Sequence, residues 1–300
     1  MSEHAYTVQA VEFASTQAAL HAVRGAVFID EQGVPAEIER DALDPACIHV
    51  LARDSAGAPI GAGRLTPDRR IGRMAVLRDW RGRGVGEALL RALVEQAQAR
   101  GWPQVSLHAQ ASAIAFYRRH GFVPQGARFM EAGIEHQTMH RVLAGPTPVE
   151  TREQALAATL AVIGHARRQL RIYSRELDPG LLDSADVIAA MRRFATGGGE
   201  VRIVLQDTDA PRRALAPLIG LAQRLPSAFA LRAVDDPVDQ AYPAAYIVND
   251  ADGWYYRPLG HSVEGETRLG DAPRARQLRQ SFDPVWERSR LATEFRTLGI

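Results

Sequence analysis

The sequence predicts an α/β protein, in the mixed α+β arrangement, built as two domains, and three observations predict it. The chain has 300 residues, long for one compact domain, with 46% hydrophobic and 24% charged residues. Apolar runs of strand length alternate with helix-forming segments in both halves. Between the halves, residues 144–150 read AGPTPVE, where two prolines and a glycine interrupt the regular patterning. We therefore expect domains at 1–143 and 151–300, joined by a linker at 144–150.

The first half alternates strands with helices that end at glycines. We expect strands at 49–52, 60–65, 71–77, 105–109 and 137–142, with helices at 85–100 and 112–120. Gly57 and Pro59 mark a turn between the first two strands, which predicts a hairpin. Gly101 and Pro103 end the first helix, and Gly121 closes the second. The order predicts antiparallel hairpins and at least one strand–helix–strand unit.

The second half continues the alternation. We expect helices at 152–169, 187–196 and 212–225, strands at 170–174, 201–205 and 228–234, and a hairpin of 244–248 and 253–257 around the turn 249–253. A final amphipathic helix is expected to contain Phe282, Val285, Trp286 and Leu291. This pattern predicts a second α/β domain.

The charge and hydropathy of the chain exclude several partners. The net charge is +1, so no global field attracts nucleic acid or an anionic membrane. No apolar run approaches the roughly 20 residues that span a bilayer. The first residues lack the charged and apolar regions of a signal peptide. We therefore expect a cytoplasmic protein that does not bind membranes.

Two residue counts exclude particular chemistries. Cys47 is the one cysteine, so an internal disulfide and a cysteine-based zinc site are excluded, and we expect no metal. All 36 basic residues are arginine, so the chain has no lysine. This count excludes Schiff-base catalysis by lysine and the lysine of a P-loop.

A glycine-rich segment, RGRGVG at residues 81–86, stands between an expected strand and an expected helix. A dinucleotide-binding fingerprint needs a third glycine five positions after the first, and that position after Gly82 is Glu87. A P-loop needs a lysine after its last glycine, and the chain has none. The pattern that remains is Arg-x-x-Gly-x-Gly, formed by Arg81, Gly84 and Gly86.

This spacing is typical of a pyrophosphate cradle. The unhindered backbone amides from Gly82 through Val85 to Gly86 can turn toward an anion at the positive end of the helix dipole. Arg81 and Arg83 add charge-assisted donors. The alternative is a plain glycine-rich turn before a surface helix.

Several separated segments resemble the GNAT superfamily of N-acetyltransferases, and together they cover residues 5–143. IGRMAV followed by RGRGVGEALL resembles the family's strand and its Q/R-x-x-G-x-G/A acetyl-CoA motif. QASAIAFYRRHGF resembles a later helix, with Ala113, Tyr117, Gly121 and Phe122 at the family's spacing and Gln110 where an asparagine is common. VRGAVFIDEQGVP and FMEAGIEHQTM, with that helix, are similar to the ElaA-like subgroup.

The resemblance implies a fold and a reaction. In a GNAT fold, the strand that holds Met74, Ala75 and Val76 would diverge from its neighbour and pair with the pantetheine arm of acetyl-CoA. The Val76 amide would polarise the thioester carbonyl, and Gln110 would add a polar contact. Tyr117 would act as general acid toward the CoA thiolate. We therefore expect an acetyl-CoA-dependent N-acetyltransferase that acts on a primary amine of a small molecule or peptide.

The general base and the acceptor stay open. A primary amine with a pKa of about 10 arrives protonated, so a carboxylate or a water relay must remove a proton. Glu31, in the DEQGVP loop, is the first candidate; the alternatives are Glu131 with His136, His49, and ordered water alone. An acidic stretch before His49 would suit a cationic amine or peptide, and a solvated loop is the alternative. Its members are Asp30, Glu31, Glu37, Glu39, Asp41 and Asp44.

Residues 151–300 resemble, in the order and length of their elements, one half of a phospholipase D-like domain that ends in the SFDPVWERS helix. Phospholipases of that class depend on an H-x-K-x(4)-D motif. The hairpin where the motif is expected, AAYIVNDADGW, has no histidine, and the chain has no lysine. His261, in LGHSVEG, is expected to be a loop residue. We expect a phospholipase D-like domain without its catalytic apparatus.

Two other functions remain alternatives. One is a non-catalytic acyl-CoA-binding sensor, in which the first domain binds the cofactor and the second binds a partner. A homodimer formed through the second domain is a separate alternative. The other is a nucleic-acid-associated protein acting through residues 151–300, although these residues show no clean basic stripe with interleaved aromatic residues.

Overall fold

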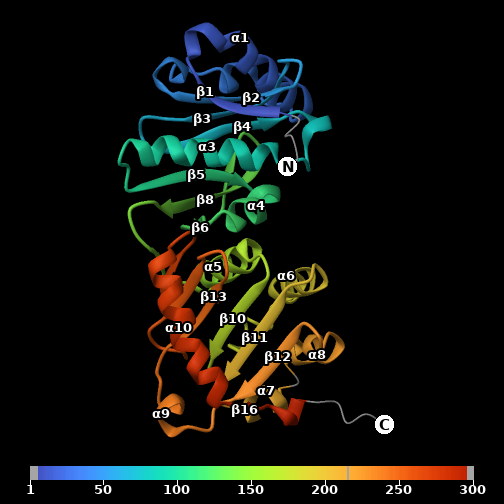
Figure 1. Ribbon diagram of the computed structural model, residues 1–300. Helices are drawn as coiled ribbons and strands as arrows, with labels where there is room; N and C mark the ends of the chain where they lie inside the picture. The colour runs from blue at the N-terminus through green and yellow to red at the C-terminus, as the bar shows by residue number, and fades with distance from the viewer. Residues whose placement is uncertain (1–5, 215, 296–300) are drawn as a thin grey trace. The chain divides into compact units, whose positions relative to one another are not determined.

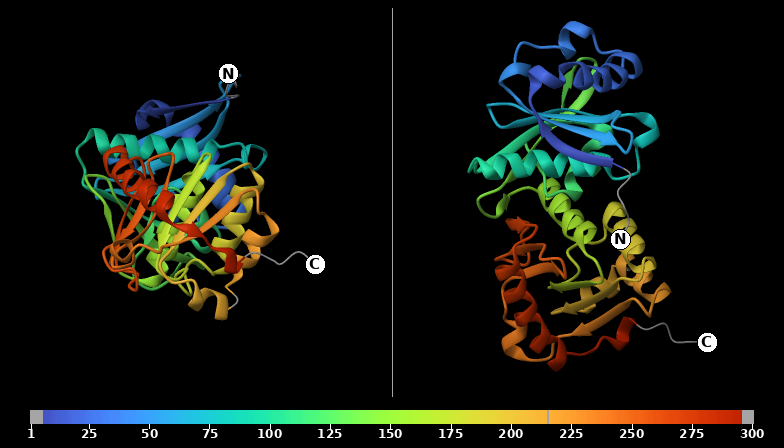
Figure 2. Two further views of the ribbon diagram at one scale, coloured as in Figure 1. Left: turned by 60° about the horizontal axis from the view of Figure 1, so that its bottom comes forward. Right: turned by 45° about the horizontal axis from the view of Figure 1, so that its top comes forward.

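The computed structural model describes residues 6–214 and 216–295 (Figures 1 and 2). Contacts divide the chain into two compact units. The first unit contains the chain up to Ser112 together with Gln125–Gly145. The second unit contains Ala113–Pro124 and the chain from Pro146 onward. The domain boundaries at 1–143 and 151–300 stay a prediction, since residues 113–124 make their contacts with the second unit.

The first unit is built on a sheet with the strand order β1-β2-β3-β4-β5-β8, and β7 pairs with β8 (Figure 1). The bounds are β1 Tyr6–Val11, β2 Ile48–Asp54, β3 Pro59–Leu65, β4 Arg70–Val76, β5 Gln104–Gln110, β7 Phe129–Glu131 and β8 Ile134–Val142. Neighbours are antiparallel except β4 and β5, which are parallel. The predicted strand–helix–strand unit is therefore confirmed as β4, α3 and β5.

Two helices, α1 and α3, pack on opposite faces of this sheet. The helical segments are α1 Phe13–Arg24, the π-helix η1 Gly25–Glu31, α2 Ala36–Glu39, η2 Asp44–Ala46, η3 Arg78–Trp80 and α3 Val85–Ala99. On β3, Ala62 packs in one apolar cluster with Leu20 of α1. A Cβ added to the next residue toward the N-terminus, Gly61, would lie 2.9 Å from Leu89 Cδ1 of α3. Successive side chains of β3 point to opposite faces of the sheet, so Ala62 faces α1 and Gly61 faces α3. Because Gly61 has no side chain, α3 can approach the sheet closely.

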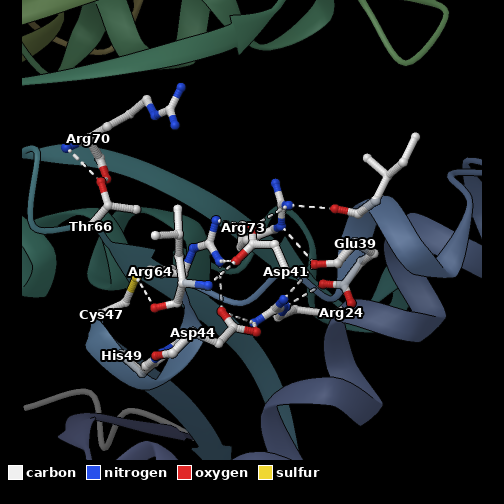
Figure 3. Close-up of polar contacts among 12 residues, drawn as sticks. Arg24, Glu39, Asp41, Asp44, Cys47, His49, Arg64, Thr66, Arg70 and Arg73 are labelled. Atoms are coloured by element: carbon white, nitrogen blue, oxygen red, sulfur yellow. Dashed lines mark hydrogen bonds and ion pairs between the residues drawn. The ribbon is translucent and has the colours of Figure 1, made fainter.

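Three arginines and three carboxylates fix the irregular segment between η1 and β2 (Figure 3). This arginine–carboxylate cluster consists of Arg24, Glu39, Asp41, Asp44, Arg64 and Arg73. Arg24 of α1 donates to Glu39 and, at 3.0 Å, to Asp44. The side chains of Arg24 and Glu39 are each 1% exposed. Four of the six side chains are buried, and the three positive and three negative charges of the cluster compensate one another, as buried charges require.

Arg64 and Arg73 connect the same carboxylates to the sheet. Arg64 Nη1 of β3 donates to Asp44 and Asp41, at 2.7 Å each, and Arg64 Nη2 donates to Asp41 at 2.8 Å. Arg73 Nη2 of β4 donates to the same Asp41 at 3.0 Å. The hydrogen bond from Arg64, the largest cause, holds the pKa of Asp41 at about 2. Asp41 is therefore a shared acceptor for two neighbouring strands.

The second unit is built on a sheet with the strand order β16-β12-β11-β10-β13-β14-β15-β9. The strands β10, β11 and β12 are parallel, and the other pairs are antiparallel. The bounds are β9 Thr147–Val149, β10 Gln169–Ser174, β11 Glu200–Leu205, β12 Phe229–Ala233, β13 Ala245–Asn249, β14 Trp254–Arg257, β15 Gly265–Arg268 and β16 Arg290–Leu291.

Helices pack on both faces of this second sheet. The helices of the second unit are α4 Ile114–Arg119, α5 Arg152–His165, α6 Ala185–Thr196, α7 Asp209–Arg213, α8 Pro217–Arg224, α9 Pro237–Gln240 and α10 Ala272–Arg288. The short segments η4 Ala111–Ala113, β6 Val123–Pro124 and η5 Thr293–Phe295 complete the elements. Ile172 of β10 belongs to the core under α5, α6 and α8, whereas the adjacent Tyr173 packs with Trp286 of α10. Successive residues of one strand therefore feed two cores.

Residues 113–124 join the second unit through the start of α5. Arg118 of α4 forms an ion pair with Glu153 at 3.1 Å. Gln154 Nε2 donates to the Pro124 carbonyl at 2.9 Å. Gln154 also completes a capping box with Thr151, which explains why α5 begins where it does.

The predicted strands are all present, and the differences concern helix ends. The helix expected at 152–169 ends at His165, because Gln169 begins β10. The helix expected at 212–225 is two helices, and Pro217 begins the second of them, as proline at a first turn does; residue 215 lies outside the described residues. Leu291 belongs to β16 rather than to the last helix. Part of the expected linker forms β9, which pairs with β15. The segments β1 and α1 were not predicted.

The stability of the first unit is expected to depend on the charge of Asp41 at low pH. Its folded pKa of about 2 lies below the ordinary aspartate value of 3.8, so its contribution to stability is present above pH 4 and is lost as pH falls toward 2. Asp41→Asn therefore lowers the urea midpoint at pH 7, and the difference from wild type narrows between pH 4 and pH 2.

The matched control for this prediction is Asp79→Asn. Asp79 is exposed and makes no ion pair among residues 6–214 and 216–295. Its small effect on the urea midpoint is expected to stay constant with pH. A constant difference for Asp41→Asn over the same range would contradict the prediction.

Candidate active site

The strands β4 and β5 separate after two paired positions. Ile71 pairs with Leu107, and no later pair joins these two strands among the described residues. Beyond this point β4 keeps β3 as its neighbour as far as Val76. β5 keeps β8 as its neighbour as far as Gln110. The divergence predicted for the strand that holds Met74 to Val76 is therefore present.

A β-bulge in β4 follows the separation. Arg64 of β3 pairs with Gly72, and Ala62 pairs with Ala75, so two residues of β4 stand opposite one residue of β3. Arg73, one of the two, has a φ of 49°, in the left-handed region that non-glycine residues avoid. A bulge bends its strand and re-aims the residues that follow.

The side chain of Arg73 secures this bulge. Its Nη2 donates to the Ile38 carbonyl at 2.8 Å, and its Nε donates to the Glu39 carbonyl at 3.1 Å. A third bond reaches Asp41 in the arginine–carboxylate cluster. The unusual backbone of Arg73 is thus stabilised by three contacts to one loop.

The glycine-rich loop leads from β4 into α3 and leaves backbone amides open to solvent. Gly82 and Gly84 have φ values of 74° and 82°, which favour glycine. Gly84 is the N-cap of α3 and supplies no side-chain cap. A Cβ at Gly82 would meet no atom within 4 Å. Helix α3 begins at the buried Val85 and continues through Gly86. Because no side chain caps this end of the helix, the backbone amides of its first turn are left for an anion to bind.

The two arginines of the loop have different environments. The Arg83 guanidinium lies over the Trp80 ring, 5.2 Å from its centroid. Arg81 Nε donates to the Val76 carbonyl at 2.9 Å, and Arg81 Nη2 donates to Glu31 at 2.8 Å. Arg81 therefore ties the end of β4 to the end of η1, where sequence reasoning expected a donor to pyrophosphate.

The end of η1 contacts both diverging strands. Glu31 reaches the end of β4 through Arg81. The next residue, Gln32, accepts a hydrogen bond from Gln110 Nε2 at the end of β5, at 3.0 Å. The structure thus brings together Glu31, Val76, Arg81 and Gln110 in the first unit.

Tyr117 lies on α4, which belongs to the second unit. It is half-buried, and its ring packs edge-on against Phe116 and Phe122, at 5.0 and 5.9 Å between centroids. Burial raises the pKa of Tyr117 to about 12. The hydroxyl therefore stays protonated across neutral pH, as a proton donor must.

The other base candidates are involved in local contacts. His49 is buried, and its Nε2 lies 2.8 Å from the Asp44 carbonyl; burial lowers the pKa of His49. His136 Nδ1 lies 2.8 Å from the Ile134 carbonyl. Glu131 pairs instead with His108, whose Nδ1 lies 2.9 Å away. Sequence reasoning missed His108, because only the pairing of β5 with β8, and of β8 with β7, brings it to Glu131.

Three residues of the acidic stretch before His49 neither bind a cationic acceptor nor form a solvated loop, the two roles that the sequence suggested. Glu39, Asp41 and Asp44 are not open to a cationic acceptor, since three arginines already pair with them. They are not a solvated loop either, because Glu39 and Asp44 are buried. Of the remaining acidic residues, Glu31 is committed to Arg81.

A pocket of about 540 Å³ opens in the second unit at the ends of β10 and β11. Arg175 and Gln206, which directly follow these parallel strands, line it. His261, expected to be a loop residue, lies between β14 and β15 and borders the same pocket. Within the described part of the chain, no group of histidine, cysteine and carboxylate side chains is placed to hold a metal ion. No described helix is long and apolar enough to cross a membrane.

Two family models match the chain. Residues 5–143 match the model described as acetyltransferase (GNAT) domain. Residues 151–298 match a domain of unknown function, DUF7931. The second match gives no support to a phospholipase D-like identity, which stays a prediction.

Individual relatives agree with the first match. The chain is 39% identical over 121 residues to the uncharacterised N-acetyltransferase YjcF of Bacillus subtilis, covering 39% of this chain and 86% of YjcF. It is 31% identical over 139 residues to protein YyaT of the same species, covering 43% and 93%. Solved structures include an acyl-CoA N-acyltransferase from Pseudomonas aeruginosa (30% identity, TM-score 0.42) and Escherichia coli ElaA (28%, 0.41). Each of these two matches covers 45% of this chain and 99% of the chain in the solved structure.

The family model and the near-complete coverage of YjcF agree on the first half of the chain. The protein therefore belongs to the GNAT family of N-acetyltransferases, a family of acyltransferases, and carries the family's domain in residues 5–143.

Proposed function

We propose that this protein transfers an acetyl group from acetyl-CoA to a primary amine of a small molecule or peptide. The observation that carries the proposal is the strand edge left by the divergence of β4 and β5, which runs directly into an open helix N-terminus. The free edge of β4 offers backbone groups to an extended amide chain, and the N-terminus of α3 offers backbone amides to an anion. Acetyl-CoA has both parts and supplies the acetyl thioester.

The residues of the first unit fit this co-substrate. The amides from Gly82 to Gly86 hold the pyrophosphate, with the Arg83 guanidinium beside them. The backbone of Met74, Ala75 and Val76 pairs with the pantetheine arm, and Gln110 adds a polar contact from β5. The Val76 amide polarises the acyl carbonyl. Arg81 contributes by holding the end of β4, since its side chain bonds the Val76 carbonyl.

Tyr117 is proposed as the general acid. Its hydroxyl is protonated at neutral pH because burial raises its pKa to about 12. A phenol of that pKa is a weaker acid than a thiol of about 8.5, so proton transfer to the thiolate is uphill and is completed by reprotonation of the phenolate from solvent. Tyr117 then donates to the leaving group as the bond to carbon breaks.

The role of Glu31 as general base stays a prediction. Its ion pair with Arg81 bears on that prediction, because a carboxylate held by a guanidinium must first release it to accept a proton. The sensor and nucleic-acid functions, the homodimer and the cytoplasmic location also stay predictions.

Calorimetric titration of the full chain with CoA tests the proposed binding site. We expect saturable binding in the micromolar range, weakened about tenfold or more by Gly82→Ala, because the added methyl occupies the open space at the cradle. Gly57→Ala is the matched control: Gly57 also has a positive φ, and its Cβ would also meet no atom within 4 Å. Absence of CoA binding by the wild type, or equal loss in both variants, would contradict the proposal.

A screen of amines and peptides with acetyl-CoA, read as released thiol, tests the reaction and finds an acceptor. With that acceptor, Tyr117→Phe is expected to lower kcat by roughly 10²–10⁴-fold while the CoA affinity is kept. Tyr242→Phe is the control, since burial also raises the pKa of that phenol to about 12. An unchanged kcat in Tyr117→Phe would leave Tyr117 a packing residue.

A further inference from the structure

His108 and Glu131 form a hydrogen-bonded pair on the first sheet. His108 Nδ1 lies 2.9 Å from Glu131 Oε2. Glu131 ends β7 at a tight turn, in which Ala132 and Gly133 have φ values of 49° and 77°. The ring of Phe129, on the same strand, packs edge-on against the imidazole with centroids 4.9 Å apart. The imidazole is therefore oriented by a carboxylate and by an aromatic ring.

This contact determines which nitrogen of His108 is free. Burial raises the pKa of Glu131, but the hydrogen bond with His108 and the nearby positive charges together outweigh burial, so the pKa lies below its usual value. An ionised carboxylate only accepts hydrogen bonds, so Nδ1 carries the proton. In the neutral ring, Nε2 then has a lone pair, and it has no hydrogen-bond partner among the described residues. The side chain is 29% exposed, so Nε2 can exchange a proton with solvent.

The imidazole lies at the point where the strands diverge. His108 directly follows Leu107, the last residue of β5 that pairs with β4. It is half-buried, as is Gln110 two residues on, whereas Leu107 is buried on the opposite face. Gly72 is the corresponding residue of β4, and a Cβ added there would meet no atom within 4 Å. No side chain therefore stands at Gly72, the position of β4 that follows the last pair with β5 just as His108 does on β5.

Other charged groups face this pair from neighbouring strands. β8 contributes His136, opposite Gln110, and His140, opposite Ser106. β4 contributes Arg70, also opposite Ser106. His136 and Arg70 both favour the ionised form of Glu131. The surrounding charge thus keeps the carboxylate as an acceptor for the imidazole.

We propose that His108 is the general base of the reaction and that Glu131 is its positioning residue. The inference rests on the proposed function. An acceptor arrives as an ammonium ion, and His108 Nε2 takes one proton from it and passes that proton to solvent. The neutral amine forms a bond to the acyl carbon, the carbon–sulfur bond breaks, and Tyr117 protonates the thiolate. The second amine proton leaves by the same route and balances reprotonation of Tyr117, so one proton is released per turnover.

The geometry favours His108 over Glu31 for this role. Glu31 accepts from Arg81 at 2.8 Å, and that arginine also holds the Val76 carbonyl. Freeing Glu31 would loosen the end of β4. His108 needs no such rearrangement, because the hydrogen bond that its side chain makes within the described part of the chain uses the other nitrogen.

The first experiment measures kcat/KM against pH with acetyl-CoA and spermidine, tyramine or a lysine-containing peptide, whichever the wild type acetylates. The wild type is expected to show a rise through pH 6–7, the range in which imidazoles lose their proton. His108→Gln removes this rise and lowers kcat by roughly 10²–10⁴-fold, with acetyl-CoA affinity by calorimetry within about twofold. Glu131→Gln lowers the plateau value of kcat/KM, because a neutral amide holds the Nδ1–H of His108 less firmly than a carboxylate does.

Two controls separate this role from a structural one. Glu135→Gln removes a carboxylate from the same hairpin, one that pairs with Arg128 rather than with a histidine, and it leaves the profile unchanged. Glu31→Gln keeps the rise through pH 6–7. A His108→Gln enzyme that keeps the rise, or a Glu31→Gln enzyme that loses it, overturns the inference while the proposed function stands.

The second experiment needs no acceptor. In the ¹³C-histidine NMR spectrum of the full chain, His108 is identified by the signal missing in His108→Gln. Acetyl-CoA is expected to shift this signal, because the acyl group enters beside the ring; an unshifted signal in a chain that binds acetyl-CoA overturns the inference. A wild type that binds no acetyl-CoA refutes the proposed function itself, and the inference with it.

Discussion

The separation of β4 from β5 after Ile71 and Leu107 is the constraint on which the first unit depends. Parallel strands normally satisfy each other's backbone groups along their whole length, and buried groups left without partners are costly. Here that pairing stops after two positions, so the edge of β4 is available to a ligand. The bulge at Arg73, the glycine loop and the end of η1 all border this edge.

The arginine–carboxylate cluster stabilises the irregular backbone that this arrangement needs. Arg73 adopts a left-handed conformation inside a strand, and three hydrogen bonds to the segment before β2 hold it there. Arg64 binds the same Asp41 from β3, so both strands share one anchor. Arginine suits this task because its planar group donates several bonds in fixed directions. A chain without lysine has only this residue for the purpose.

Partners, rather than residue type, decide what each carboxylate of the first unit does. Glu39 and Asp44 neutralise buried arginines. Glu31 accepts from Arg81, which also holds the end of β4. Glu131 orients an imidazole. A carboxylate bound to a guanidinium stays charged and fixed in place. A carboxylate bound to one nitrogen of an imidazole fixes the tautomer and orientation of the ring, and so affects proton transfer at the other nitrogen.

By itself, the sequence determined the features that depend on local pattern. The central strands of both sheets follow from apolar runs, whereas edge strands such as β1, β7 and β15 were not predicted; the predicted cradle rests on the spacing of Arg81, Gly84 and Gly86. Only the tertiary structure decided which charges meet. Glu31 and Arg81 are 50 residues apart, and His108 and Glu131 are 23 apart. Such pairs arise from strand order and register, which no local pattern of residues specifies.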